Sequence, residues 1–538
     1  MKCLLLSFAR SAFAPSKTKY GSSLSLSLSS SSYTSSLYAW NDMFSIQQPR
    51  TILFSSSKTT TTDIETEHRQ GQMMPNTLVV GGGLAGLATA AALRNIANID
   101  AVHVVEKMCD TLANESAGAA IQLGPNAFKA LEAIGGGKTF VEKIYEAGSV
   151  LEETLILLPG AADGTVTPTA SIPNTAKAET GYPIVLVRWG VLRKLLGELL
   201  PEESLSFGTG SEIVGYAFSD DDDDDDKDNG NNNMNNNVEP VDKEGKKVAV
   251  DGSSFSSSQL IIGADGLHSV FRERVQTNTM TVPVPEKDSE QSVSSSSLKD
   301  MKRVNIKAVV PVELKELGVP FTKEGATFAQ FSPQLAGFAG PAGKGHTYWA
   351  ISVADDEESG SKFLSFINDD DGYKAASKKL LLEKLEASSS SDGVDRKWII
   401  SLVERTDSNA IWINRSLEAP VKETDSFVSK DARVVLVGDA AHAMNSSFGQ
   451  SASFAFEDAA TLALLLKENN ENDNGSSRKN NSNKINNNDV AKALQDYSDK
   501  RTGRCMEIQR RSEERAAKAM RGEEELEDVS KWIYAWKP

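Results

Sequence analysis

The sequence predicts an α/β fold with two sheets, on three observations. A short apolar strand at Thr77–Val80 runs into a glycine-rich turn and an Ala- and Leu-rich helix, and a second strand follows at Ala101–Val105. Such a strand–helix–strand unit is typical of a parallel sheet. Two later apolar strands, Leu260–Ile262 and Val434–Val437, also end in glycine turns. Further apolar segments predict a second sheet with strands at Leu155–Leu158, Pro183–Val187, Val304–Val312 and Thr347–Val353.

Composition excludes several classes of protein. The 538 residues are 39% hydrophobic and 24% charged, which suffices for a large core and is too little apolar content for a polytopic membrane protein. A net charge of −17 argues against nucleic acid or anionic lipid as the main partner. Cys3, Cys109 and Cys505 lie far apart, and the five histidines are scattered. We therefore expect neither a disulfide framework nor a metal site.

Residues 1–70 predict a disordered targeting presequence. Residues 20–61 are crowded with Ser and Thr and contain few acids, as organelle transit peptides do. Ahead of them, Lys2, the apolar run Cys3–Ala9 and the small residues around Phe13 resemble a signal peptide. Together they resemble the bipartite presequence of algae with secondary plastids, so we expect a plastid protein, with the mitochondrion as the alternative.

Three low-complexity stretches predict disordered surface insertions. Residues 219–237 are mostly Asp and Asn, residues 287–299 are rich in Ser, and residues 468–488 are rich in Asn. None can bury enough apolar surface to offset the entropy of ordering.

The first glycine turn has the spacing of a dinucleotide site. Gly81, Gly83 and Gly86 form G-x-G-x-x-G, in which Gly81 permits the tight turn, Gly83 allows backbone to approach a pyrophosphate, and Gly86 lets the helix pack on the strand. The N-terminus of the helix then favours an anion. Glu106 follows at the end of the second strand, where it can accept hydrogen bonds from a ribose diol. An acid at this position favours FAD or NAD. His103 is expected to be a packed strand residue.

The two later turns also place acids at strand ends. Asp265 lies in the stretch Gly263–Gly266, which suits a loop that approaches a ligand. The alternative is that Asp265 caps a helix. Asp439 follows Gly438 and precedes His442, which we interpret as a residue packing under a cofactor, with a catalytic role as the alternative. A further turn at Phe448–Ser451 leads into a helix predicted over Ala452–Leu466.

These motifs, in this order and spacing, resemble the FAD-dependent monooxygenases of the aromatic-hydroxylase type, a group that includes salicylate hydroxylase-like enzymes, kynurenine monooxygenase and zeaxanthin epoxidase. Val187–Leu192 resembles the family's element whose Arg contacts the flavin, and Tyr497, Arg501 and Arg504 resemble its C-terminal helix. Trp532–Tyr534 is similar to a tail in zeaxanthin epoxidase.

The resemblance implies a Rossmann-type FAD-binding domain with an inserted mixed β-sheet substrate domain and a C-terminal helical segment. The FAD-binding domain would be discontinuous, over residues 75–147, 188–280 and 430–515. The substrate domain would cover 148–187 and 300–425, and a tail would follow at 516–538. The cofactor-binding residues would be Gly81, Gly83, Leu84, Ala85, Gly86, Glu106, Arg188, Asp265, Gly438, Asp439, Gly449, Gln450, Ser451 and Ala452.

The implied reaction uses NADH or NADPH as a transient reductant and dioxygen, and hydroxylates or epoxidises a small apolar, aromatic or isoprenoid substrate through a flavin C4a-hydroperoxide. No catalytic side chain is assigned. Phe328, Phe331, Phe338, Tyr348 and Trp349 either line an apolar pocket or form plain core.

Three serines depart from the family's pattern. Ser446 replaces a Pro, Ser451 a Gly and Ser453 a common Asn. The side chain of Ser451 would either crowd the flavin or donate a hydrogen bond. Two alternatives to a monooxygenase stay open. A flavoprotein reductase of isoprenoid side chains shares the same glycine motifs, and the three serines leave open a degenerate FAD-binding protein.

Overall fold

A computed structural model of the 538-residue chain provides the structure. It describes residues 75–109, 112–157, 170–208, 213–218, 237–242, 244–248, 258–277, 298–317, 325–332, 334–355, 363, 372–387, 396–445, 448–473, 487–521 and 529–538. The predicted presequence and most of the insertions at 219–237 and 287–299 lie outside these residues. The predicted insertion at 468–488 is narrower than expected, because the helix before it continues to Asp473 and the next begins at Asn487.

A parallel sheet of five strands, in the order β17-β11-β1-β2-β8, forms the first layer. Its strands are β1 (Thr77–Val80), β2 (Val102–Glu106), β8 (Leu205–Phe207), β11 (Leu260–Gly263) and β17 (Val434–Leu436). The strands β1, β11 and β17 are buried along their whole length, as their continuous apolar runs require in a sheet covered on both faces. The strands predicted beside the three glycine motifs are confirmed.

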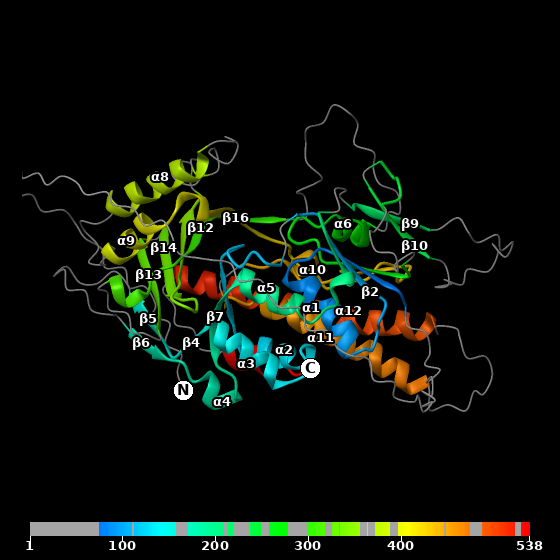
Figure 1. Cartoon of the computed structure of the whole chain (residues 1–538). Helices are drawn as coiled ribbons and strands as arrows, with labels where there is room; N and C mark the ends of the chain where they lie inside the picture. The colour runs from blue at the N-terminus through cyan, green and yellow to red at the C-terminus, as the bar shows by residue number, and fades with distance from the viewer. Residues whose placement is uncertain are drawn as a thin grey trace, which may run out of the picture. The chain divides into compact units, whose positions relative to one another are not determined.

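Helices pack around this sheet, and α1, α11 and α12 run beside one another (Figure 1). They are α1 (Leu84–Asn95), α2 (Pro125–Ile134), α3 (Lys138–Ala147), α5 (Trp189–Gly197), α6 (Val270–Thr277), α11 (Ser451–Asp473) and α12 (Asn487–Arg521). The α1 helix packs against α11, and its residues Ala88 and Ala91 are fully buried. No helix of the described residues is both long and apolar enough to span a bilayer.

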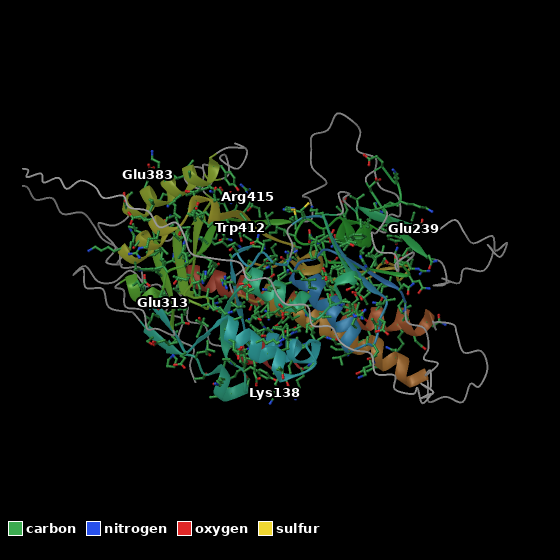
Figure 2. All side chains as sticks on the ribbon, viewed as in Figure 1. Lys138, Glu239, Glu313, Glu383, Trp412 and Arg415 are labelled. Atoms are coloured by element: carbon green, nitrogen blue, oxygen red, sulfur yellow. The ribbon has the colours of Figure 1, made fainter. Side chains whose placement is uncertain are left out.

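The second sheet has seven strands in the order β16-β12-β15-β14-β13-β5-β6, and it is mixed because β5 and β13 are parallel. Its strands are β5 (Glu153–Leu157), β6 (Ala170–Pro173), β12 (Lys299–Val310), β13 (Gly325–Ser332), β14 (Leu335–Pro341), β15 (Thr347–Ala354) and β16 (Trp412–Glu418). One face is covered by α8 (Tyr373–Ala387) and α9 (Lys397–Arg405) (Figure 1). Among the described strands, β16 pairs only with β12, and its Trp412 and Arg415 are labelled in Figure 2.

The five aromatic residues expected to form a pocket or core lie on both faces of this sheet. Phe331 and Trp349 are completely buried in the core under α8 and α9. Phe338 and Tyr348 lie on the opposite face, where they pack in a separate cluster with residues of other sheets. Phe328 pairs directly with Phe338 and shares its face.

A small third sheet corrects one expectation. The apolar pattern of Pro183–Val187 predicts a strand of the second sheet, but β7 (Ile184–Arg188) pairs with β3 (Ala120–Leu123) and β4 (Ser149–Leu151) instead. Val185 and Val187 are buried in the core of the first sheet, whereas Leu186 packs in a cluster with Ala326 of β13 and with Ala342, which follows β14. Because both faces of β7 are buried, its apolar pattern could not tell which sheet it would join.

The remaining elements are short. They are α4 (Ala176–Thr180), η1 (Glu202–Ser204), β9 (Gly215–Phe218), β10 (Val238–Val241), η3 (Leu314–Leu317), η4 (Ser408–Ala410), α10 (Asp439–His442) and α13 (Val529–Tyr534).

Deleting the acidic insertion should leave the fold intact. The strands β9 and β10 form an antiparallel pair in which Phe218 is directly opposite Val238, so a two-residue Asn-Gly turn can replace residues 219–237. We expect the free energy of unfolding, measured by urea denaturation, to change by less than about 0.5 kcal/mol, as for other surface changes. Loss of soluble protein would show that the insertion contributes to the folded structure.

Candidate cofactor site

Of the three glycines of the G-x-G-x-x-G motif, the protein's own packing requires Gly81 and Gly86 but not Gly83. A Cβ on Gly81, whose φ is +114°, would lie 2.3 Å from the carbonyl oxygen of Ala264. A Cβ on Gly86 would lie 1.9 Å from the carbonyl oxygen of Gly81. A Cβ on Gly83 would meet no described atom within 4 Å. Gly83 is also the N-cap of α1 and provides no side-chain hydrogen bond, so the turn opens onto an uncapped helix N-terminus.

Glu106 is held beside this turn. One carboxylate oxygen accepts the N–H of Gly82 at 2.8 Å, and the other accepts the N–H of Met108 at 2.9 Å. Each oxygen keeps a lone pair for a further donor. Glu106 therefore lies beside the glycine turn, and its contact with a ribose diol stays a prediction.

Asp265 fits the alternative interpretation as a helix cap. Its carboxylate accepts the N–H of Val270, the first residue of α6, at 2.9 Å. Burial raises the pKa of Asp265 above its usual value. The structure therefore assigns Asp265 a contact in the protein itself, and its predicted contact with a cofactor stays a prediction.

The third turn lies directly against the first. Gly438 has a φ of +60°, and a Cβ there would lie 2.7 Å from the Cβ of Ala85 at the start of α1. The next residue, Asp439, is exposed. The Arg272 guanidinium donates to the carbonyl oxygens of Asp439 and Ala440, both at 2.8 Å, and so ties α6 to this turn. The carboxyl ends of β1, β11 and β17 therefore meet at one edge of the sheet, where ligands bind in open α/β folds.

The turn before α11 is hydrogen-bonded to the turn that contains Asp439. Gly449 has a φ of +63°, and the buried side chain of Gln450 accepts a hydrogen bond from Asn126 at 3.0 Å. The hydroxyl of Ser451 donates to the Asp439 carboxylate at 2.6 Å. The Ser451 hydroxyl therefore has an acceptor within the protein, and its effect on a bound flavin stays a prediction. Ala452 is the second residue of α11, and Ser453 is fully buried. Ser446 lies outside the described residues.

Arg188, the last residue of β7, is buried and incompletely satisfied. It is 8% exposed, and its Nε has no hydrogen-bond partner among the described residues. One terminal nitrogen lies 3.5 Å from a Glu115 oxygen. A buried guanidinium N–H without a partner is costly unless a ligand accepts it.

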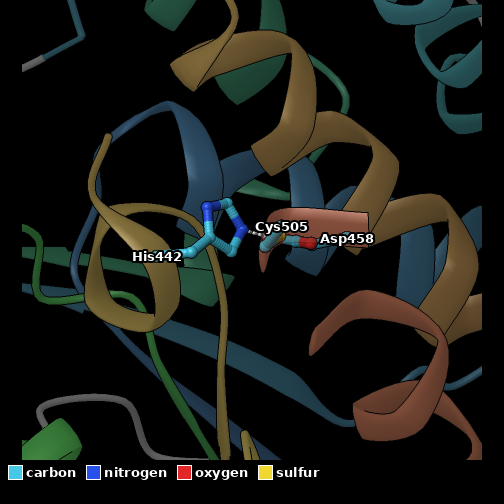
Figure 3. A group of neighbouring side chains, drawn as sticks. All are labelled: His442, Asp458 and Cys505. Carbon is cyan, nitrogen blue, oxygen red and sulfur yellow. Dashed lines mark hydrogen bonds and ion pairs between the residues drawn. The ribbon is translucent and has the colours of Figure 1, made fainter. Parts of the chain in front are cut away.

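A buried network of charged side chains holds the turn at Gly438 in place. Figure 3 shows His442 and Asp458, whose Nε2 and carboxylate are 2.6 Å apart, beside Cys505. The same carboxylate accepts the N–H of Gly438 at 2.8 Å and the Arg501 Nε at 2.6 Å. Burial alone lowers the pKa of His442, but the attraction of Asp458 raises that pKa well above the ordinary value. His442 is fully buried, as the packing interpretation expected, and supports the Gly438 turn.

Ligating atoms of His442, Asp458 and Cys505 lie within 4.8 Å of one another, the spacing of a metal site. The Asp458 oxygens already accept from three protein donors, so an ion-pair network accounts for the cluster.

The network continues through Glu457, which sequence reasoning did not identify as a site residue. Its carboxylate accepts from Arg501 and Arg504, each at 2.6 Å, and from Asn126 at 2.7 Å. Because Asn126 also donates a hydrogen bond to Gln450, a chain of hydrogen bonds connects the arginines of α12 to the turn before α11. A local motif search could not find this set, since α2, α11 and α12 are far apart in the chain.

The C-terminal segment completes this support. The Lys129 ammonium donates to the carbonyl oxygen of Tyr534 at 2.6 Å, and Arg504 donates to that of Ile533 at 2.9 Å. The Arg504 guanidinium also lies 4.6 Å from the ring centre of Trp532. The predicted tail therefore contains a short helix, α13, that packs on the network.

No family model matches the chain. Curated relatives include the FAD-dependent monooxygenase ausM of Penicillium brasilianum, 24% identical over 392 residues that cover 72% of this chain and 69% of the relative. The aurachin C monooxygenase/isomerase of Stigmatella aurantiaca is 26% identical over 398 residues, 72% of this chain and 80% of the relative. The chloroplastic zeaxanthin epoxidase of Nicotiana plumbaginifolia is 26% identical over 72% of this chain, which spans 48% of that enzyme.

Solved structures share the fold. Klebsiella pneumoniae HpxO, complexed with FAD and uric acid, aligns with a TM-score of 0.58 and 18% identity over 88% of this chain and 95% of its own. CtdE in complex with FAD and a substrate aligns with a TM-score of 0.60 and 16% identity over 86% and 96% of the two chains. The curated relatives that match most of the chain are FAD-dependent monooxygenases, the chain carries the glycine motifs of the aromatic-hydroxylase type, and it shares its fold with FAD-binding structures.

Proposed function

We propose that the chain is an FAD-dependent monooxygenase that uses NADH or NADPH and dioxygen to hydroxylate or epoxidise a small apolar, aromatic or isoprenoid substrate. The observation that carries this proposal is the meeting of three strand-end turns around Gly83, where the backbone leaves open space beside an uncapped helix N-terminus. When bound, FAD supplies the redox chemistry that moves one oxygen atom from dioxygen to the substrate.

The residues of the site fit this cofactor. The N-terminal N–H groups of α1 would bind the pyrophosphate, since Gly83 presents no side chain there. Glu106 would accept from the ribose hydroxyls, and the buried Nε of Arg188 would donate to a polar atom of the flavin. Asp439, held by Ser451, would orient the chain of hydroxyls between phosphate and ring.

Oxygen dependence tests the proposal. The purified full chain should be yellow, and its oxidation of NADPH in the presence of substrate should need dioxygen. Turnover in the absence of oxygen would instead support the reductase of isoprenoid side chains. A protein that binds FAD and oxidises NADPH under neither condition would support the degenerate alternative.

Replacing Ser451 with glycine tests the altered turn. The change removes the hydroxyl that holds Asp439 but keeps the backbone N–H of residue 451, so we expect FAD to stay bound. The fraction of NADPH oxidation that yields oxygenated product should rise or stay the same, because the turn then has the family's own residue. Loss of FAD or of turnover would show that the bond from Ser451 to Asp439 is needed.

We also propose that residues 1–70 direct the chain to a plastid. The support is the acid-poor, Ser-rich composition behind a short apolar run. Fusion of this segment to a fluorescent protein in an alga with secondary plastids should label the plastid, and labelling of mitochondria would contradict the proposal.

A further inference from the structure

One face of the seven-stranded sheet carries a lysine in line with aromatic side chains. Lys307 of β12 is directly opposite Ala350 of β15, which is opposite Phe338 of β14, which is opposite Phe328 of β13. Residues paired in this way share a face, so the four form a row across the sheet. We call this face the site face. The neighbours of Lys307 in sequence, Ile306 and Ala308, point the other way into the core under α8 and α9.

The site face adjoins the elements that build the cofactor site. Phe338 and Tyr348 pack in a cluster with Ala120 of β3 and Leu186 of β7, and β7 ends at Arg188. Lys307 itself is close enough to Asp439 for their charges to attract, although burial lowers its pKa below the usual lysine value. The Lys307 side chain therefore lies on the face of the seven-stranded sheet that is near the turn containing Asp439.

The Lys307 ammonium has no partner that explains its position. No described residue forms a hydrogen bond or an ion pair with its Nζ. Asp439, the acid whose charge acts on Lys307, already accepts the hydroxyl of Ser451. Lys307 is half-buried, and a lysine partly withdrawn from water without a partner is unfavourable; such groups commonly bind a ligand.

We propose that Lys307 is a substrate-recognition residue that binds an oxygen anion of the substrate, a carboxylate, phenolate or enolate, while the apolar part of the substrate lies along the row towards Phe338 and Phe328. This inference rests on the proposed function and narrows its substrate class. An acidic aromatic or enolic compound fits the row, whereas a pure hydrocarbon would cover the half-buried ammonium and leave it without a partner.

Equilibrium dialysis of the full-length, FAD-loaded protein with cinnamate and with cinnamamide tests the proposal. The two probes have nearly the same shape and differ in charge. We expect Lys307→Met to weaken cinnamate binding by about tenfold to a hundredfold, the usual range for a lost charge-assisted hydrogen bond, and to leave cinnamamide binding unchanged. Lys307→Arg should keep most of the cinnamate affinity. Lys302→Met is the matched control, because Lys302 is an exposed lysine of the same strand that already pairs with Asp300.

Equal cinnamate binding by the wild type and Lys307→Met, including no binding by either, would overturn the proposal. So would loss of FAD from Lys307→Met, because Lys307 would then serve to neutralise Asp439. The dialysis needs no turnover, so an absence of oxygen-dependent NADPH oxidation would count against the proposed function and leave the binding result intact.

Discussion

Replacing Gly83 with valine is expected to give a folded protein that contains no FAD. A Cβ on residue 83 would meet no described atom within 4 Å, so the side chain should not disturb the protein's own packing. It would instead occupy the space that the pyrophosphate needs next to the α1 N-terminus. We expect the affinity for FAD to fall by at least a hundredfold, about 3 kcal/mol, measured by titration of the apoprotein with FAD.

Two further glycine variants make this result specific. Gly86→Ala places a Cβ 1.9 Å from the Gly81 carbonyl oxygen, so we expect it to reduce the yield of folded protein as well as FAD binding. Gly503→Ala on α12 meets no described atom within 4 Å and is far from the turn in sequence, so it should bind FAD normally. Normal FAD binding by Gly83→Val would refute the placement of the pyrophosphate.

Replacing Arg501 with leucine is expected to cost about 3–5 kcal/mol of unfolding free energy, the usual effect of removing one partner from a buried ion pair. Arg501 is 1% exposed and donates to Asp458, to Glu457 and to the carbonyl oxygen of Phe454. Its loss would leave two adjacent carboxylates buried between α11 and α12 with fewer donors. Urea denaturation of the wild type and the variant measures the difference.

Lys492→Met is the matched control for this helix. Lys492 forms a 3.3 Å pair with Asp496, but its side chain is 66% exposed, so we expect less than about 1 kcal/mol. The effect of Arg501→Leu should also depend on pH. Although burial opposes it, the charges of His442 and Arg501 lower the pKa of Asp458 in the folded chain. The ionised Asp458 carboxylate therefore stabilises the folded chain at neutral pH, and this stabilisation is lost as the pH falls through the lowered pKa of Asp458. Equal costs for Lys492→Met and Arg501→Leu would show that the network is not a source of stability.

The parts of this protein whose chemistry is local can be predicted from the amino-acid sequence. The turn at Gly81–Gly86 and its partner Glu106 are recognisable because a strand, a tight turn and a helix N-terminus depend on neighbouring residues. The turns at Asp265 and Asp439 are recognisable for the same reason. The structure places all of them at one edge of the parallel sheet.

Which distant residues meet depends on the packing of the whole chain. The sheet to which β7 belongs depends on cores that bury both of its faces. The alternation of apolar and polar residues along β12 is visible in the sequence. Which face of β12 lies toward Asp439 is not, so the sequence did not single out Lys307. Arg501 and Asp458 are on different helices, and their pairing is favourable only after burial has removed water from both. Such contacts arise from packing between segments far apart in the chain, and no local pattern of residues specifies them.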